Sequence, residues 1–402
     1  MINCSRRDGS ACAVNEVAER LARNHEVQLF ARSVEDLDLS HIRWRRMPGV
    51  PWPHVADFLT YYCLAELRIW RRRFDIVHSI GANTRAANVI TIQNIQPAKR
   101  IFLQSFAGSE KVSLPRKLTR ELYLNITTRA EGAVYRKRAN RRPPLFLPVS
   151  RGVQGELLSY YDIGDAPIRI VPNAADTNRF KPSPPTVRDG WRAANGLAPK
   201  DILLVFVGGE WRRKGLDFAI KALAKIREAN VKLLVLGKDS EQPQFEALAM
   251  ETGVNQRVFF LGFRRDVSEA MGAADIFLFP SWYEAFSLAT IEAGACGLPI
   301  LATKINGTED FVVPGESGMF IERDPDQIAA VLRPLLENPA QRRRMGENAR
   351  RIVEQRYTWD RVAKMTEEAY FEYLDGTQGD PDWHARKGRR WGRGPRFLGA
   401  AR

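Results

Sequence analysis

The chain has 402 residues, a length that allows two domains with substantial cores. Its 44% hydrophobic and 27% charged residues are ordinary for a globular protein, and the lack of any apolar run of about eighteen residues argues against a membrane-spanning helix. The 61 Lys and Arg outnumber the 47 Asp and Glu, and the resulting net charge of +14 favours an anionic partner such as a phosphate group, an acidic membrane surface or nucleic acid.

The cysteines are scattered along the sequence, with no CxxC motif and no histidine close by: Cys4, Cys12, Cys63 and Cys296. This pattern predicts reduced thiols in a cytoplasmic protein, and neither a disulfide framework nor a zinc site. The N-terminal segment "MINCSRRDGS" also lacks the long apolar core of a secretory signal.

Apolar runs alternate with amphipathic stretches from end to end, a pattern typical of parallel α/β architecture. In the first half, helical spacing predicts helices at 11–23 and around 117–139. Short apolar runs predict strands at 26–31, 75–80, 88–93, 145–150 and 168–173. Residues 180–200 are rich in Pro and Gly, and we expect them to form a domain boundary or a surface loop.

The second half is a regular series of strand–helix units. Its strands are nearly all apolar, which indicates that helices cover both faces of a parallel sheet. They are predicted at 201–207, 231–237, 257–262, 275–280 and 298–303. Helices are predicted between them, and further helices at 325–336, 339–355 and 359–375. Two successive series of this kind predict two doubly wound, Rossmann-like domains with a ligand cleft at the carboxyl ends of their strands.

The segment "FVGGEWRRKGLDFAI" combines a glycine pair with three cations. The glycines at 208–209 let the backbone approach a ligand closely. The next helix is predicted to start at about Lys214, and a helix N-terminus attracts anions, so Arg212, Arg213 and Lys214 would complete a diphosphate site. The spacing is not that of the GxxxxGK[ST] phosphate loop, which disfavours an ATPase. The alternative is an exposed basic turn.

The stretch "FPSWYEAFSLATIEAGACGLPI" places Glu284 and Glu292, with seven residues between them, among apolar and small residues. A helix is expected to begin near Phe286 or Ser287, so Glu284 would lie before it and Glu292 on its second turn. Eight helical residues rise about 12 Å, close to the length of a ribose–diphosphate–sugar unit. The two carboxylates would then bind hydroxyls at its two ends, and the free N–H groups of Phe286, Ser287 and Leu288 would face the phosphates. The alternative is a first-turn acid and a solvated side chain.

The order of these motifs resembles glycosyltransferase family 4, the retaining enzymes of GT-B fold. The family's order is also matched by "RDGSACAVNEVAERLARNHEV", "FDIVHS", "VSRGVQGELLSYY", "IVPNAADTNRF", "GFRRDVSEAMGAADIFLFP" and "GESGMF". The match covers most of the chain, and the second half looks most similar to bacterial glucosyltransferases of lipopolysaccharide core assembly. The resemblance implies an acceptor-side N-terminal domain (1–170), a nucleotide-sugar-binding C-terminal domain (171–355) and a helix packing back on the N-terminal domain (356–375). Residues 376–402, rich in Gly, Arg and Trp without periodicity, are expected to form a disordered basic tail.

The resemblance also implies roles for individual residues. Arg213 and Lys214 would bind the diphosphate of a UDP- or GDP-sugar and stabilise the leaving nucleotide, which is electrostatic catalysis without a metal or other cofactor. Glu284 would contact the donor-sugar hydroxyls and Glu292 the ribose. The remaining donor contacts would come from the Gly9 amide across the cleft, Arg264 beside the base, and Phe286, Ser287 and Leu288 at the phosphates. The family's mechanism is commonly drawn as front-face attack, so no enzyme nucleophile is implied.

Two features depart from the family pattern. Many members carry a histidine after the strand that corresponds to 88–93, where this chain has Gln93 or Asn94. His78, in the neighbouring predicted strand, is a further candidate, although a lone histidine is more often structural. Asp8, in the N-terminal loop, is another candidate site residue. Only "MINCS" precedes this loop, so we expect that the first strand is very short or that the natural start lies upstream.

The implied acceptor is a glycan or a lipid-linked sugar, with hexose transfer in cell-surface polysaccharide or lipopolysaccharide synthesis. The basic and aromatic segments 52–74 and 119–142 are candidates for contact with an anionic bilayer, which would place the protein peripherally on the inner face of the cell membrane. Core-facing helices with solvated basic ends are the alternative. No specific nucleic-acid partner is expected. Alternative functions are a nucleotide-sugar epimerase of GT-B fold and a non-catalytic membrane- or RNA-binding protein on that scaffold.

Overall fold

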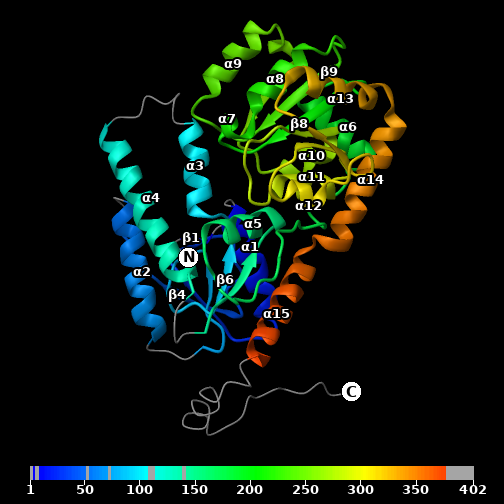
Figure 1. The fold of residues 1–402 in the computed structure, drawn as a ribbon. Coiled ribbons are helices and arrows are strands. Elements are labelled where there is room, and N and C mark those ends of the chain that lie inside the picture. Colours follow the sequence, from blue (N-terminus) through cyan, green and yellow to red (C-terminus); the bar gives the residue numbers. More distant parts are fainter. Residues whose placement is uncertain are drawn as a thin grey trace, which may run out of the picture.

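The computed structural model of the chain describes residues 3–4, 9–50, 54–70, 74–106, 114–137 and 142–376. These residues form two lobes of parallel strands and helices, which lie one above the other in Figure 1. Asp8 and the basic segment beyond Gly376 lie outside the described residues.

The N-terminal lobe contains short parallel strands. They are β1 (Asn3–Cys4), β2 (Val27–Ala31), β3 (Ser33–Val34), β4 (Ile42–Arg46), β5 (His78–Ile80), β6 (Val89–Ile92) and β7 (Leu145–Pro148). β1 pairs with β3, β2 pairs with β4, and β5, β6 and β7 form a three-stranded sheet. The helices of this lobe are α1 (Gly9–Leu21), α2 (His54–Trp70), α3 (Gln96–Phe106), α4 (Leu114–Tyr135) and α5 (Arg151–Tyr160).

One strand predicted for this lobe is wrong. Residues 168–173 run beside β7 but form only an isolated bridge, between Phe146 and Ile168. The N–H of Val171 donates to the carbonyl oxygen of Pro148 at 3.0 Å. Pro148, in β7, has no N–H group with which to return a bond and continue the ladder. The segment is therefore a connection between the lobes and not a strand.

The C-terminal lobe is built on a six-stranded parallel sheet in the order β10-β9-β8-β11-β12-β13. Its strands are β8 (Ile202–Val207), β9 (Val231–Leu236), β10 (Val258–Gly262), β11 (Ile276–Phe279), β12 (Ile300–Thr303) and β13 (Gly318–Ile321). Alternate residues of β8 enter different apolar clusters, Leu203 and Val205 in one, Leu204 and Phe206 in the other. The sheet is thus buried on both faces, as its apolar strands predict.

Helices cover both faces of this sheet. They are α6 (Pro185–Ala194), α7 (Trp211–Lys214), α8 (Leu216–Ala224), α9 (Gln242–Glu251), α10 (Val267–Ala273), α11 (Leu288–Ala295), α12 (Thr308–Phe311) and α13 (Pro325–Glu337), with a 3-10 turn, η2, at Asn255–Arg257.

The segment 180–200, expected to be a loop or boundary, contains helix α6. Pro185 occupies the first helical position, where its fixed φ suits the helix and its missing N–H would be unsatisfied anyway. Trp191 in α6 is buried, and its indole N–H donates to Asp266 Oδ2 at 3.0 Å. The proline that suggested a loop here begins a packed helix.

The chain returns to the N-terminal lobe through α14 (Pro339–Arg356) and α15 (Trp359–Asp375), drawn in orange along one side of both lobes in Figure 1. Helix α15 packs against α1, where Ala13 and Trp359 lie in one apolar cluster. Arg20 Nε also donates to Asp360 Oδ1 at 2.7 Å. These contacts tie the end of the described chain to its first helix.

Candidate active site

The predicted basic turn follows β8, but it has a different local structure from the one expected. Arg212, Arg213 and Lys214 lie within the one-turn helix α7, and the main helix, α8, begins at Leu216. Gly215 separates the two helices with a φ of 77°, in the left-handed region that favours glycine. The cations therefore form a helical turn of their own and do not lie in a loop before α8.

Gly215 also holds α7 against the loop that follows β11. A methyl group on Gly215 would overlap the carbonyl oxygen of Pro280. In the same contact, the N–H of Trp282 donates to the carbonyl oxygen of Arg213 at 2.9 Å. The close approach of the two backbones brings the cations of α7 beside the acidic loop.

Arg213, Lys214 and Glu284 form a single cluster at this edge of the sheet. Arg213 Nη1 donates to Glu284 Oε1 at 2.9 Å, and Lys214 Nζ lies 3.5 Å from the same oxygen. The three side chains are only 19%, 13% and 15% exposed, respectively. Glu284, which has no basic neighbour in sequence, thus has two cationic partners from a segment about seventy positions earlier.

The two predicted carboxylates differ in their electrostatic surroundings. Burial would raise the pKa of Glu284, but Lys214 and Arg213 outweigh that effect and hold its pKa below the usual value. Burial raises the pKa of Glu292 to about 7, against the weaker attraction of Arg179 and Lys214. Glu284 is therefore a stabilised carboxylate, whereas Glu292 is a half-buried acid that titrates near neutral pH.

Helix α11 begins at Leu288, one or two residues later than predicted, so Glu292 lies on its second turn as expected. Ser287 caps the helix, and its hydroxyl oxygen accepts from the N–H of Thr290 at 3.3 Å. Across the cleft, a methyl group on Gly9 would lie 3.4 Å from Leu288 Cδ1. The N-termini of α1 and α11 thus meet in the cleft.

A second contact joins the lobes beside the helix start. Gln93, which follows β6, exchanges side-chain hydrogen bonds with Asn173 at 3.2 and 3.4 Å. Asn173 Nδ2 also donates to the carbonyl oxygen of Phe286 at 3.1 Å. Gln93, one of the two residues expected where many family members carry histidine, therefore lies at this contact between the lobes.

Arg264 lies away from the cationic cluster. It follows β10, which lies two strand spacings, about 10 Å, from β8, the strand before the cations. Three spacings, about 14 Å, separate β10 from β11, the strand before Glu284. Its guanidinium contacts both carboxylate oxygens of Asp266 at 2.7 and 2.8 Å, and Nη1 donates to Asn195 at 3.1 Å. The separation suits the two ends of a nucleotide sugar, although the Arg264 side chain is held by neighbouring residues.

His78 does not join the site. His78 is the first residue of β5, whereas it was expected toward the end of the predicted strand 75–80, so it lies at the end of the sheet opposite the cleft. Its ring nitrogens lie 2.5 Å from the Tyr370 hydroxyl and 2.7 Å from the Thr91 hydroxyl. His78 therefore links β5 to α15, and the structural alternative holds for this residue.

Tyr283 makes contacts between the lobes that the sequence did not predict. Its ring stacks on Phe102 of α3, with centroids 5.3 Å apart, and its hydroxyl donates to Glu156 Oε2 at 3.1 Å. Asn306 Nδ2 donates to the other oxygen of Glu156 at 2.7 Å. These residues are far apart in sequence, so no local pattern links them.

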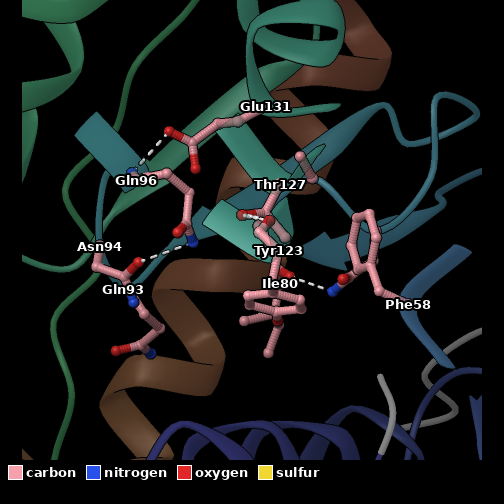
Figure 2. A pocket seen from close by; sticks show the side chains of 11 residues that line it. Phe58, Ile80, Gln93, Asn94, Gln96, Tyr123, Thr127 and Glu131 are labelled. Carbon is pink, nitrogen blue, oxygen red and sulfur yellow. Dashed lines mark hydrogen bonds between the residues drawn. The ribbon is translucent and has the colours of Figure 1, made fainter. Parts of the chain in front are cut away.

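The N-terminal lobe contains a cavity of about 180 Å³ next to Gln93 (Figure 2). Glu131 lies in its wall, where Oε1 accepts from the N–H of Gln96 and from the Tyr161 hydroxyl, each at 2.9 Å. Burial raises the pKa of Glu131 to about 7 in spite of these two donors. Sequence reasoning missed this acid because it lies within an ordinary amphipathic helix.

Within the described ranges, no cluster of His, Cys, Asp and Glu has the arrangement of a metal site. In the same part of the chain, no helix combines the length and apolar character needed to span a membrane. Cys12, Cys63 and Cys296 are free thiols.

Two family models match the chain. The model described as Glycosyltransferase Family 4 matches residues 7–179, and the model described as Glycosyl transferases group 1 matches residues 187–352. Lipopolysaccharide glucosyltransferase WaaG of Escherichia coli K12 is 35% identical over 46% of this chain and 50% of WaaG. MMP alpha-(1->4)-mannosyltransferase of Mycolicibacterium hassiacum is 30% identical over 58% of this chain and 55% of that protein. The chain thus spans about half the length of the curated relatives it matches.

Solved structures agree over a greater length. The crystal structure of WaaG has a TM-score of 0.74 at 25% identity and covers 92% of this chain and 97% of its own. Sucrose-phosphate synthase of Thermosynechococcus elongatus, at 21% identity, has a TM-score of 0.74 with 92% and 94% coverage, and shares the fold. The predicted fold class, two Rossmann-like lobes facing across a cleft, is confirmed. The chain belongs to glycosyltransferase family 4 and has the GT-B fold.

Proposed function

We propose that the protein is a retaining glycosyltransferase that moves a hexose from a UDP- or GDP-sugar to a hydroxyl of a glycan or glycolipid. The observation that carries the proposal is the cluster of Arg213, Lys214 and Glu284 at the carboxyl edge of the six-stranded sheet. The names of its relatives support a role in lipopolysaccharide or other cell-surface glycan synthesis, since WaaG is a lipopolysaccharide glucosyltransferase. A further structure of this fold, HepE of Anabaena at 18% identity, is of a complex with UDP and glucose.

The chemistry proposed for the cluster is stabilisation of a leaving diphosphate. Arg213 and Lys214 would neutralise the negative charge that develops on the nucleotide as the glycosidic bond breaks. Because both cations are held in place before the reaction, little reorganisation is needed in the transition state. We propose that this electrostatic role takes the place of a metal cofactor.

Glu284 is proposed to bind the donor sugar and not to attack it. Its carboxylate already contacts Arg213 and Lys214, and an incoming diphosphate would compete for both cations. The carboxylate oxygens would then accept hydrogen bonds from sugar hydroxyls. With Glu284 in this role no enzyme nucleophile is assigned, and retention would follow from attack on the face that the leaving group vacates.

Glu292 is proposed to bind the ribose. It lies on the second turn of α11, behind the amides of the helix start where the phosphates would sit. Binding of the diphosphate between the carboxylates leaves the base near the strand end that carries Arg264. The Gly9 amide would contact the donor from the other lobe.

We also propose a peripheral location at the cytoplasmic face of the cell membrane, without a specific nucleic-acid partner. Large apolar side chains are exposed on neighbouring helices α3 and α4: Ile101 is 58%, Leu118 64% and Leu122 53% exposed. Exposed apolar residues beside arginines suit the interface of an anionic bilayer. Co-sedimentation with phosphatidylglycerol vesicles tests this, and equal binding by Leu118→Ser/Leu122→Ser and the parent protein would contradict it.

The activity is tested in two steps. A thermal-shift screen of UDP- and GDP-sugars should find a donor that raises the melting temperature, since a ligand that binds only the native state stabilises it. Proton NMR of that donor, with a lipopolysaccharide core oligosaccharide lacking its outer hexoses, should then show a new glycoside with the donor's anomeric configuration. Release of a free epimerised sugar, or an inverted product, would contradict the proposal.

A further inference from the structure

The cavity in the N-terminal lobe lies directly beside the proposed donor site. Gln93 lines the cavity and hydrogen-bonds Asn173, which in turn donates to the carbonyl oxygen of Phe286. One side chain therefore separates the cavity from the residues proposed to bind the donor. Its volume of about 180 Å³ is below the range of about 300 to 1,000 Å³ typical of drug-sized ligands. The cavity is thus suited to a single sugar ring.

The charge of the cavity is opposite to that of the chain. The protein carries a net charge of +14, yet the described residues that line the cavity include no Lys or Arg. Phosphates and carboxylates are usually bound by these cations or by helix N-termini. Helix α3 begins in the cavity wall, but the N–H of its first residue, Gln96, already donates to Glu131 Oε1. The carboxylate in the wall, Glu131, would instead repel an anionic group.

Glu131 has an oxygen that lacks a partner within the described part of the chain. The residue is 3% exposed, and both donors that reach it, the Gln96 N–H and the Tyr161 hydroxyl, bond to Oε1. Figure 2 shows one oxygen joined to Gln96 and the other turned toward the labelled side chains. This oxygen faces the cavity, where the hydroxyl of a ligand could donate a hydrogen bond to it.

The rest of the wall suits a polyhydroxylated ring. Asn94 and Gln96 present amide groups that both donate and accept, as sugar hydroxyls do. Phe58 and Tyr123 form an aromatic wall, with centroids 6.3 Å apart and an edge-on arrangement. A ring with one apolar face and hydroxyls at its edge matches both surfaces.

We propose that this cavity selects the acceptor: it takes a sugar ring that carries no phosphate or carboxylate, with a hydroxyl bound to Glu131. The inference rests on the proposed glycosyltransferase function. It adds to that function that the acceptor sugar beside the reacting hydroxyl is uncharged. Glu131 acts as a specificity-determining residue and has no part in breaking the donor bond.

The test is saturation-transfer NMR on the full chain saturated with UDP. The probes are the methyl α-glycosides of glucose, galactose and mannose, each paired with the corresponding hexose 6-phosphate. At least one methyl glycoside should bind more tightly than the corresponding hexose 6-phosphate. Glu131→Gln should weaken the binding of that glycoside at least fivefold. Gln96→Ala, at a half-buried amide, should weaken it as well. Glu121→Gln on the same helix, where the carboxylate pairs with Arg100, is the matched control and should bind normally.

Tighter binding of a hexose phosphate, no binding of any neutral glycoside, or normal binding by folded Glu131→Gln would each overturn the inference. Calorimetric titration of UDP and of GDP into the parent protein separates this failure from failure of the proposed function. If UDP binds but the glycosides give any of these three results, the acceptor inference alone is wrong. If neither UDP nor GDP binds, the proposed function fails first.

Discussion

Arg213 Nη1 donates to Glu284 Oε1 at 2.9 Å, although the two residues belong to different strand–helix units. Arg213 and Glu284 thus form one partly buried ion pair, and both side chains face the proposed donor. Because a diphosphate and Glu284 would compete for the same cation, the pair predicts opposite effects on the binding of nucleotide and on the turnover of nucleotide sugar.

Glu284→Gln should separate these two effects. The variant removes the competing charge, so UDP should bind as tightly as to the parent protein or more tightly. Turnover of a UDP-sugar should fall at least tenfold, about 1.4 kcal/mol in transition-state stabilisation, because sugar contacts are lost. Glu210→Gln is the control, because Glu210 also contacts Arg213 but is 69% exposed. Equal loss of turnover in Glu284→Gln and Glu210→Gln would contradict the proposal that Glu284 binds the donor sugar.

Gly215→Ala should disturb the site through the backbone. The added methyl group would overlap the Pro280 carbonyl oxygen and push α7 away from the loop after β11. Gly253→Ala is the control, since Gly253 has a similar φ of 72° with open space around it. Both variants incur about 1 to 2 kcal/mol of left-handed strain, but only Gly215→Ala should also lose UDP affinity. Melting curves and calorimetry measure the two quantities, and identical behaviour of the two variants would be evidence against the close approach.

A pair of glycines in α5 tests the contact between the lobes. A methyl group on Gly152 would overlap Asn306, which donates to Glu156, whereas a methyl group on Gly155 meets nothing within 4 Å. Gly152→Ala should therefore lower the melting temperature. Gly155→Ala should keep or raise it, since alanine is favoured over glycine in a helix by about 1 kcal/mol. The contact has no energetic importance if Gly152→Ala is as stable as Gly155→Ala.

Glu292 should make stability depend on pH. Its folded pKa of about 7 lies above its ordinary value, so between these values the native state binds more protons than the unfolded state. The free energy of unfolding contributed by this group therefore falls as pH rises through that window, by up to about 3 kcal/mol. Glu292→Gln removes the effect, and its melting temperature relative to the parent protein should be higher at pH 8 than at pH 5. A difference that does not change with pH would contradict the raised pKa.

The sequence predicted the C-terminal lobe better than the N-terminal lobe for a physical reason. Buried parallel strands such as β8 and β11 are continuous apolar runs, and few other secondary structures fit such runs. In the N-terminal lobe, strands of two or three residues, such as β1 and β5, carry little pattern, and the register of His78 was misjudged there. Prolines misled in both directions, because Pro185 starts a helix and Pro148 ends the ladder between β7 and the predicted strand 168–173.

The candidate site was predictable where one segment carried it. The cations of α7 and the acids of 284–292 were found from local motifs, but the ion pair that joins them depends on Gly215 meeting Pro280. Glu131 and Glu156 were missed because each acquires its surroundings only from other parts of the chain. Long-range contacts of this kind leave no trace in spacing.

The most direct measurement is calorimetric titration of UDP into the parent protein, Lys214→Ala and Arg212→Ala at one salt concentration. Arg212 stands two positions before Lys214, but its guanidinium pairs with Glu241 and not with the cleft acid. We expect Lys214→Ala to lose at least tenfold in affinity, about 1.4 kcal/mol. Arg212→Ala should stay within about twofold of the parent, less than about 0.5 kcal/mol. Equal affinity of the parent protein and Lys214→Ala would contradict the claim that the cluster binds the donor diphosphate.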